Sequence, residues 1–239
     1  MQRICKTECA GLYLSQFLIE IICVVSVLIT AGSTREYIDP VRYISSGSSG
    51  KQGYALAECM GKMGWDVKLV SCPVALAPRQ DLYQTYHVNT SADMLNTCLS
   101  LLPVDVAILT AAITDWVPYR CKHKLKKHAV DRIDMLHSPD IAKCISMNKN
   151  RPKLVIGFCL ESENLIESAK NKLAYKGCDW IIANHYYVNE HEPVMHSNYN
   201  QVSIVTRDSV RPFQMMTKVE VAKLLTEEII DYLNRLDIP

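Results

Sequence analysis

Several short motifs that would identify a ligand directly are missing from this chain of 239 residues. Its ten cysteines contain no C-x-x-C pair, which argues against a zinc ribbon. Only nine residues are glycine, and they form neither the G-x-G-x-x-G loop of dinucleotide-binding enzymes nor the G-x-x-x-x-G-K-S/T phosphate loop. At the place nearest to a phosphate loop, Ser45 and Gln52 stand where glycine and a hydroxyl residue are required.

A charge excess is also missing. The chain has 26 Lys and Arg against 25 Asp and Glu, which gives a formal net charge of +1. This balance does not favour nucleic acid or an anionic membrane over a small ligand, so we expect neither as a partner. Any site for an anion must therefore be local.

The cysteines and histidines do not indicate a metal site. The cysteines are scattered, several within apolar runs, which predicts small buried hydrophobes in a reducing, cytoplasmic compartment. His191 and His196 lie in H-E-P-V-M-H, which is one residue longer than the helical H-E-x-x-H pair and contains a proline. We expect a polar loop there and assign no metal ligands to protein side chains.

The first 24 residues differ from the rest of the chain. An apolar stretch over 12–30 superficially resembles a signal peptide or an anchor. Glu20 interrupts it, and its last part, VSVLITAGSTRE, predicts a buried strand that enters a functional loop. We therefore expect an N-terminal extension over 1–24, followed by one domain over 25–239 that is large enough for its own core.

Apolar runs rich in β-branched residues alternate with helical patterns. The expected strands span 25–30, 66–70, 104–110, 154–158 and 180–183. They are separated by helices over 53–63, over 91–102 after a cap-like Thr90-x-x-Asp93 start, over a segment opened by Ser138-Pro139-Asp140, and over 163–176. A further strand in QVSIVT and a closing helix over 217–236 follow. This order predicts an α/β fold, a Rossmann-like, doubly wound and mostly parallel sheet with a small appended β lobe. Four residues fall just beyond expected strand ends, where this architecture binds ligands: Gly32, Asp115, Glu161 and Asn184.

Two glycine-containing loops follow the first expected strand. The first, AGSTRE, contains only Gly32, and the second contains Gly47, Gly50 and Gly53 after an extended segment that carries Arg42. Backbone N–H groups of small residues at the start of a helix bind anions well. The two loops could therefore converge on one anion.

The chain resembles a known enzyme family through a series of motifs. These are ITAGSTREYIDPVRYISSGSSGKQGYALAE, VKLVSCPV, TAAITDW, KLKK, SPDIAK, VIGF with Glu161, and KLAYKGCDWIIAN. In this order they resemble phosphopantothenate–cysteine ligase over about 25–184, without the flavin-dependent decarboxylase to which the ligase is often fused. The resemblance implies a free-standing ligase of coenzyme A biosynthesis.

The resemblance also implies a reaction. The family activates the carboxylate of 4′-phosphopantothenate with CTP, forming an acyl-cytidylate and pyrophosphate, and L-cysteine then gives 4′-phosphopantothenoylcysteine and CMP. Mg²⁺ would accompany the nucleotide, and the choice of CTP over ATP stays open. A homodimer is implied, through the segment beyond Asn184 and the lobe around KLKK.

The implied nucleotide site combines a loop lysine, strand ends and two helix lysines. Lys124 would lie against the phosphates and assist anhydride formation, and Phe158 would pack by the base. Lys172 and Lys176 are four residues apart, so they share one face of the expected helix and would reach the nucleotide from the side. The other implied contacts are Leu109, Thr110, Ala111, Asp115, Val155, Ile156 and Gly157.

The implied acyl site lies around the second glycine loop. Arg42 matches an arginine of the family's active site, and Ser46 stands where the family usually has the asparagine associated with conversion of the intermediate into product. The phosphate would be held by Ser48, Ser49, Gly50 and Lys51.

Two departures and two alternatives accompany this resemblance. Ser33 replaces a common Gly or Pro, and FCLES replaces Phe-Ala-Ala-Glu near the base. Serine lacks the two amide donors of asparagine, so Ser46 is compatible with a catalytically impaired homologue that acts as a binding protein. An NAD(P)-dependent reductase would need a Y-x-x-x-K pair, and Tyr119 is followed by His123 at that spacing.

Overall fold

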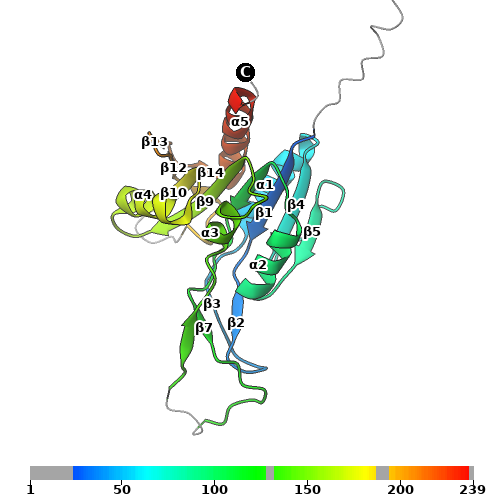
Figure 1. The fold of residues 1–239 in the computed structure, drawn as a ribbon, viewed down its shortest axis with the longest axis vertical. Helices are drawn as coiled ribbons and strands as arrows, with labels where there is room; N and C mark the ends of the chain where they lie inside the picture. Colours follow the sequence, from blue (N-terminus) through cyan, green and yellow to red (C-terminus); the bar gives the residue numbers. More distant parts are fainter. Residues whose placement is uncertain (1–23, 128–131, 187–193, 237–239) are drawn as a thin grey trace, which may run out of the picture.

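An eight-stranded sheet forms the centre of the computed structural model, which describes residues 24–127, 132–186 and 194–236 (Figure 1). Its strands are β1 (Ser26–Ala31), β4 (Asp66–Ser71), β5 (Gln84–His87), β6 (Val106–Leu109), β9 (Leu154–Glu161), β10 (Trp180–His185), β12 (Val202–Val205) and β13 (Val210–Pro212). Nearly all of the N-terminal extension expected over 1–24, and His191 of the expected polar loop, lie outside the described residues.

The strand order confirms the predicted doubly wound fold. It is β13-β12-β10-β9-β6-β1-β4-β5, and the six strands from β10 to β5 are parallel while β12 and β13 are antiparallel. Strand β1 is central, and the chain leaves it first toward β4 and then returns to β6 on the other side. The reversal between β1 and β6 is where such sheets bind ligands.

Within the described residues, five helices cover the two faces of the sheet: α1 (Lys51–Lys62), α2 (Ser91–Ser100), α3 (Ile141–Ser146), α4 (Leu165–Lys176) and α5 (Lys218–Leu236). Helices α1 and α5 pack on the face that buries Ile29, whereas α2, α3 and α4 pack on the face that buries Leu28. This alternation follows from the two-residue period of side chains along a strand. Both faces are covered, which explains why the inner strands are apolar throughout.

The helix starts agree with the sequence signals. Thr90 and Asp93 form the expected capping box at α2, and Asp140 caps α3 by accepting from the backbone N–H of Lys143. Helix α1 begins at Lys51, two residues earlier than expected, after Gly50 with φ 75° and with no side-chain cap. The backbone N–H groups in the first turn of α1 therefore remain available to an acceptor other than a capping side chain.

Two antiparallel hairpins form an arm beyond the carboxyl edge of the sheet (Figure 1). One joins β2 (Arg35–Tyr37) to β3 (Tyr43–Ser45), and the other joins β7 (Trp116–Pro118) to β8 (Met135–His137). Asp39 is fully buried in the arm and accepts from the backbone N–H groups of Val41, Arg42 and Leu125, so it ties both hairpins together. The arm and a small pair, β11 (Tyr199–Asn200) with β14 (Met216–Thr217), are the appended antiparallel structure.

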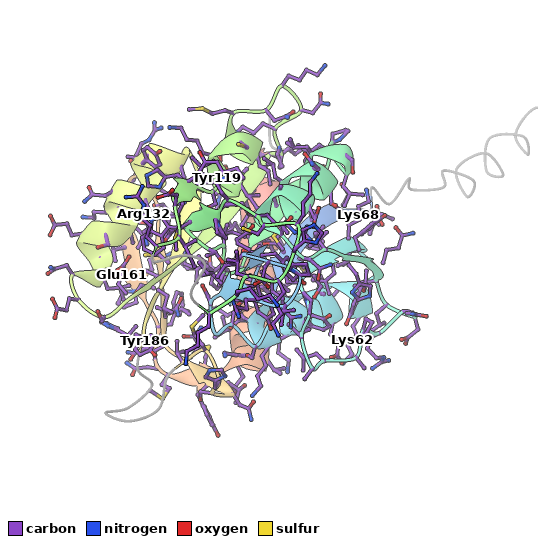
Figure 2. All side chains as sticks on the ribbon, turned by 90° about the horizontal axis from the view of Figure 1, so that it is seen from below. Lys62, Lys68, Tyr119, Arg132, Glu161 and Tyr186 are labelled. Carbon is purple, nitrogen blue, oxygen red and sulfur yellow. The ribbon has the colours of Figure 1, made fainter. Side chains whose placement is uncertain are left out.

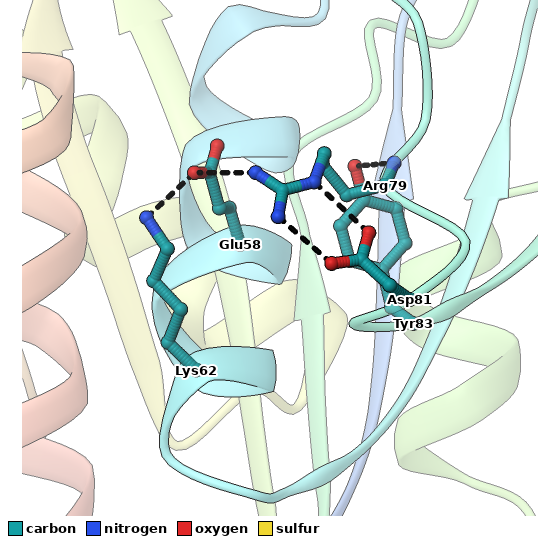
Figure 3. Close-up of polar contacts among 5 residues, drawn as sticks. All are labelled: Glu58, Lys62, Arg79, Asp81 and Tyr83. Atoms are coloured by element: carbon teal, nitrogen blue, oxygen red, sulfur yellow. Dashed lines mark hydrogen bonds and ion pairs between the residues drawn. The ribbon is translucent and has the colours of Figure 1, made fainter.

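A polar network fixes the segment that leads into the edge strand β5 (Figure 3). Arg79 forms two hydrogen bonds to Asp81, of 2.9 and 2.8 Å, and contacts Glu58 of α1, which also pairs with Lys62 at 2.7 Å. The backbone N–H of Arg79 donates to the Tyr83 hydroxyl. These charges are solvent-exposed, so the network orients the segment more than it stabilises the fold.

The described cysteines are free thiols, and four of them are buried. Burial raises the pKa of Cys72 and Cys98 to about 12 and that of Cys178 to about 11. These thiols therefore stay neutral and act as small hydrophobic side chains, as predicted from their apolar surroundings.

Helix α1 lies so close to β1 that its first turn requires glycine. A Cβ atom at Gly53 would lie 2.7 Å from Ala31 Cβ and 2.7 Å from Thr110 Oγ1. We predict that Gly53→Ala lowers the free energy of unfolding by about 1–3 kcal/mol, as overpacking does, in urea denaturation. Gly47→Ala is the control, because its Cβ would meet only His196, at an ordinary 3.5 Å. Equal stability of both variants would contradict the tight approach.

Candidate active site

Two cavities open at the carboxyl edge of the sheet on either side of the reversal between β1 and β6. The α1 cavity, of about 160 Å³, is lined by 48–53, 110–112, Phe158, Leu160, Asn184, Val194, Met195, Asn200 and Lys218. The α3 cavity, of about 620 Å³, is lined by Thr30, Met94, Leu109, Ala111, Ile113, Asp115, Trp116, 137–142, Gly157, Phe158, Tyr175 and Lys176. Ala111 and Phe158 line both, so the two cavities share a wall.

The two glycine-containing loops meet at the α1 cavity, as the sequence suggested. The backbone N–H of Ser48 donates to Ser33 Oγ at 2.9 Å, which joins the second loop to the first. A Cβ atom at Gly50 would lie 2.9 Å from Val74 Cγ1 and 3.4 Å from the backbone nitrogen of Gly32. Ser33, which departs from the residues common in the family, thus has a structural role here.

A C-terminal segment is fastened to the second loop. Ser49 Oγ donates to the backbone oxygen of Met195 at 2.6 Å, and Lys51 Nζ donates to the backbone oxygen of His196 and to Asn198 Oδ1, both at 2.8 Å. Ser49 and Lys51 were predicted to hold a phosphate, and both line the α1 cavity. In the structure, their polar side-chain groups hold the segment that closes one side of this cavity.

The helix lysines form ion pairs with two different elements. Lys176 lines the α3 cavity and pairs with Asp140, the N-cap of α3, at 2.7 Å. Lys172 pairs with Glu161 at the end of β9, and Glu161 lies on the side of α4 in the view from below (Figure 2). Burial alone would lower the pKa of Lys172, but the hydrogen bond to Glu161 holds it above its ordinary value, so the lysine stays cationic.

The remaining predicted nucleotide contacts separate into three groups. Gly157 and Phe158 line the α3 cavity, together with Leu109, Ala111 and Asp115, whereas Thr110 lines the α1 cavity. Val155 and Ile156 are fully buried in β9, between β6 and β10, and belong to the core. Val155 and Ile156 would therefore affect a bound nucleotide only indirectly, by fixing the position of β9.

Several lining residues were not anticipated from the sequence. Trp116, His137 and Tyr175 border the α3 cavity, and Asn200 and Lys218 border the α1 cavity. Trp116 and Tyr175 belong to the motifs TAAITDW and KLAYKGCDWIIAN, but their side chains were given no role, and Lys218 was expected only as a residue of the closing helix. Its burial depends on the return of the C-terminal segment over α1, which local patterns do not encode.

Three predicted catalytic residues lie toward the arm. Arg42 Nη1 lies 3.3 Å from Asp39 Oδ2, and its Nη2 donates to the backbone oxygen of Leu125 at 3.4 Å. Lys124 is next to Leu125 in the chain, so the arm brings Arg42 and Lys124 together, and Ser46 is exposed where the arm joins the second loop. None of the three lines either cavity of the described part of the chain.

Comparison with known proteins decides the family. Residues 24–233 match the profile of the DNA/pantothenate metabolism flavoprotein C-terminal domain. The chain belongs to this family. This family agrees with the resemblance that the sequence motifs indicated. It does not support the alternative of an NAD(P)-dependent reductase, and Tyr119, the residue on which that alternative depended, is exposed on the arm.

Members of this family with curated names include fused proteins. The coenzyme A biosynthesis bifunctional protein CoaBC of Borreliella burgdorferi is 36% identical over 205 residues, covering 82% of this chain and 50% of that protein. CoaBC of Bacillus subtilis is 36% identical over 207 residues, covering 85% and 50%. The chain therefore spans about half the length of the curated relatives that it matches.

A solved structure of this family supports the fold directly. The crystal structure of the C-terminal domain of CoaBC superposes with a TM-score of 0.73 at 35% identity, covering 88% of this chain and 96% of that one. Within the described ranges, no helix is both long and apolar enough to cross a bilayer. The same residues contain no cluster of three or more His, Cys, Asp or Glu side chains suited to a metal ion.

The buried Asp39 carboxylate makes the arm sensitive to acid. Burial alone would raise the pKa of Asp39, but the N–H groups of Val41, Leu125 and Arg42 and the Arg42 charge hold it below its ordinary value. The stabilisation is therefore complete above the ordinary carboxyl pKa of about 3.9 and is lost as the pH falls below it. An asparagine at this position could not accept at both places, since Asp39 Oδ1 and Oδ2 are both acceptors.

We predict that Asp39→Asn lowers the hydrogen-exchange protection of the Leu125 amide at pH 7 and that this difference from the unmodified protein shrinks toward pH 3. Protection factors, corrected for intrinsic exchange, measure it. Asp134→Asn is the control, because Asp134 is 67% exposed on the same arm. Unchanged protection in Asp39→Asn would show that this carboxylate does not hold the two hairpins together.

Proposed function

We propose that this chain is a phosphopantothenate–cysteine ligase. It activates the carboxylate of 4′-phosphopantothenate with CTP to an acyl-cytidylate and pyrophosphate, and then couples it to L-cysteine with release of CMP. The observation that carries the proposal is the pair of cavities that share Ala111 and Phe158. One substrate bound in each cavity would have its reacting end beside that of the other substrate, where the two cavities adjoin.

The acyl substrate would occupy the α1 cavity. Its phosphate would accept from the N–H groups of the uncapped first turn of α1, where Gly50 permits close approach. Its carboxylate would then point past Ala111 toward the α3 cavity. The hydroxyl of Ser48, which also lines the cavity, would add a donor.

The nucleotide would occupy the α3 cavity. Leu109, Ala111 and Gly157 would offer backbone groups, Phe158 would pack by the base, and Asp115 would contact the nucleotide. Lys176 would supply positive charge, because bringing a carboxylate to a triphosphate requires cations that offset the repulsion. Mg²⁺ would bind through the triphosphate oxygens, as it does when the protein contributes few ligands.

The arm supports a homodimer in which one subunit completes the site of the other. It carries the cations Arg42 and Lys124, and it exposes apolar side chains at Val41 (59%), Trp116 (52%) and Leu136 (53%). Apolar residues gathered on a projecting element mark an interaction surface, and a second copy is the commonest partner. Lys124 of one arm would then reach the triphosphate in the α3 cavity of the partner.

The proposed functional unit is the domain over 25–239, acting on small molecules in the cytoplasm. Ser46 would take part in conversion of the acyl-cytidylate, where a serine has one hydroxyl in place of an amide's two donors. A catalytically impaired homologue is the second candidate, and the exposed Ser46 is the observation that favours it.

We predict that the purified protein releases pyrophosphate from CTP only when 4′-phosphopantothenate and Mg²⁺ are present, and that CMP appears once L-cysteine is added. The same assay with ATP measures base preference. An acyl-cytidylate that cysteine barely consumes would favour the impaired homologue, and Ser46→Asn should then speed its conversion. Absence of pyrophosphate with either nucleotide would rule out the ligase.

We further predict that two inactive variants restore activity when they are coexpressed. Lys124→Gln disables the arm and Lys176→Gln disables the α3 cavity, so a mixed dimer with exchanged arms contains one intact site. Random pairing should give about one quarter of the unmodified activity. Coexpression of Lys124→Gln with Arg42→Gln is the control, since both arms are then defective. No recovery in the first mixture would show that each arm serves its own subunit.

A further inference from the structure

Three buried carboxamide side chains line the α1 cavity. Gln52 comes from α1, Asn184 from β10 and Asn200 from β11, and they are 9%, 7% and 3% exposed. Asparagine and glutamine are mostly exposed in folded proteins, because a buried amide group must find hydrogen-bond partners. Three of them around one cavity therefore give part of its wall a polar, uncharged character.

The surrounding elements fix the direction of two of these side chains. Gln52 Nε2 donates to the backbone oxygen of Lys218 at 3.1 Å, which identifies Oε1 as the free, accepting end of this amide. In β11, Tyr199 is exposed and Asn200 is buried, so the two-residue period of the strand directs Asn200 inward, toward the cavity that it lines. Both side chains therefore belong to the cavity wall and not to the outer surface.

The oxygens of these two side chains have no partner within the described part of the chain. Gln52 Oε1 and Asn200 Oδ1 are shielded from solvent and accept no hydrogen bond there. Buried acceptors are satisfied in the great majority of cases, so two unsatisfied ones in one cavity wall need an explanation. A bound molecule with two hydrogen-bond donors would satisfy them. The last side-chain torsion of an asparagine has a broad minimum, so the Asn200 oxygen can turn toward such a molecule.

The charges in the cavity wall indicate that these donors are neutral. The described residues that line the cavity include lysine but neither Asp nor Glu, so a cationic donor would find no counter-charge in this part of the wall. Hydroxyl and amide N–H groups donate hydrogen bonds without carrying charge. The acyl substrate, 4′-phosphopantothenate, has a hydroxyl and an amide N–H close together in its pantothenoyl part. Its two neutral donors match the two unsatisfied acceptors in number.

We propose that Gln52 and Asn200 are specificity-determining residues, which accept one hydrogen bond each from the hydroxyl and the amide N–H of the pantothenoyl part. This inference rests on the proposed function and adds recognition of the uncharged middle of the acyl substrate, whereas the start of α1 binds its phosphate. Because the Asn200 oxygen is unpaired in the free protein, this side chain contributes to binding and not to the stability of the fold.

Titration calorimetry with two altered substrates tests this recognition without turnover. In one analogue of 4′-phosphopantothenate, hydrogen replaces the hydroxyl, and in the other an ester oxygen replaces the amide N–H. We expect each change to weaken binding to the unmodified protein by about three- to tenfold, as loss of one neutral hydrogen bond does. In Asn200→Leu one of these two losses should disappear, because the acceptor for that donor is gone, and in Gln52→Met the other should disappear.

Urea denaturation separates this role from a structural one. Leucine resembles asparagine in branching and has no unsatisfied acceptor, so Asn200→Leu should leave the unfolding midpoint of the ligand-free protein unchanged or raise it. Its affinity for 4′-phosphopantothenate should nevertheless fall by about three- to tenfold. Asn234→Leu is the matched control, because Asn234 is exposed near the end of α5, and it should retain the affinity and both analogue losses.

The outcomes separate the inference from the proposed function. Full affinity for both analogues, in a protein that binds 4′-phosphopantothenate, would overturn the inference alone. Analogue losses that persist in both Asn200→Leu and Gln52→Met would do the same. No binding of 4′-phosphopantothenate by the unmodified protein would contradict the proposed function and the inference together. If Asn200→Leu does not fold, Asn200→Ala takes its place in the same comparison of analogues.

Discussion

The close approach of α1 to β1 is the constraint on which the rest of the site depends. Gly53 leaves no room for a side chain against Ala31 and Thr110, so the helix start is pressed onto the carboxyl edge of the sheet. The N–H groups of that helix start therefore border a cavity beside the end of β6. If a side chain at position 53 held α1 farther from the sheet, the N–H groups of its first turn would move away from Ala111 and Phe158, which form the wall shared with the α3 cavity.

Charge distribution follows from this geometry. The chain has almost no net charge, yet cations collect at one edge of the sheet from different elements: Lys218 from α5, Lys176 from α4, and Arg42 and Lys124 from the arm. Each of the first three is held by a partner, so the charges are positioned before any ligand arrives. Such preorganisation is what a reaction between two anions requires.

Much of the fold was predictable because the inner strands and the main helices carry strong local signals. The apolar run before Gly32, the Thr90–Asp93 capping box and Asp140 at the start of α3 led directly to elements of the doubly wound sheet. The short edge strand β5 and the individual strands of the arm were missed, because segments such as QTYH and the exposed strand β8 have no buried face to impose an alternating pattern.

The site was predictable only in part, for a similar reason. Residues at strand ends, such as Ala111, Asp115 and Phe158, could be placed at the edge from the strand order. The hydrogen-bond partners of Lys51 and the burial of Lys218 come from a segment more than 140 residues later in the chain than the second loop. Contacts of that range are set by the tertiary fold and leave no trace in local spacing.

A crystal structure with 4′-phosphopantothenate and a non-hydrolysable CTP analogue would test the central claim most directly. The account predicts the phosphate of the first ligand at the start of α1, the triphosphate in the α3 cavity, and the carboxylate beside the α-phosphorus across Ala111 and Phe158. Ligands bound elsewhere, or with the carboxylate and the α-phosphorus too far apart to react, would contradict it.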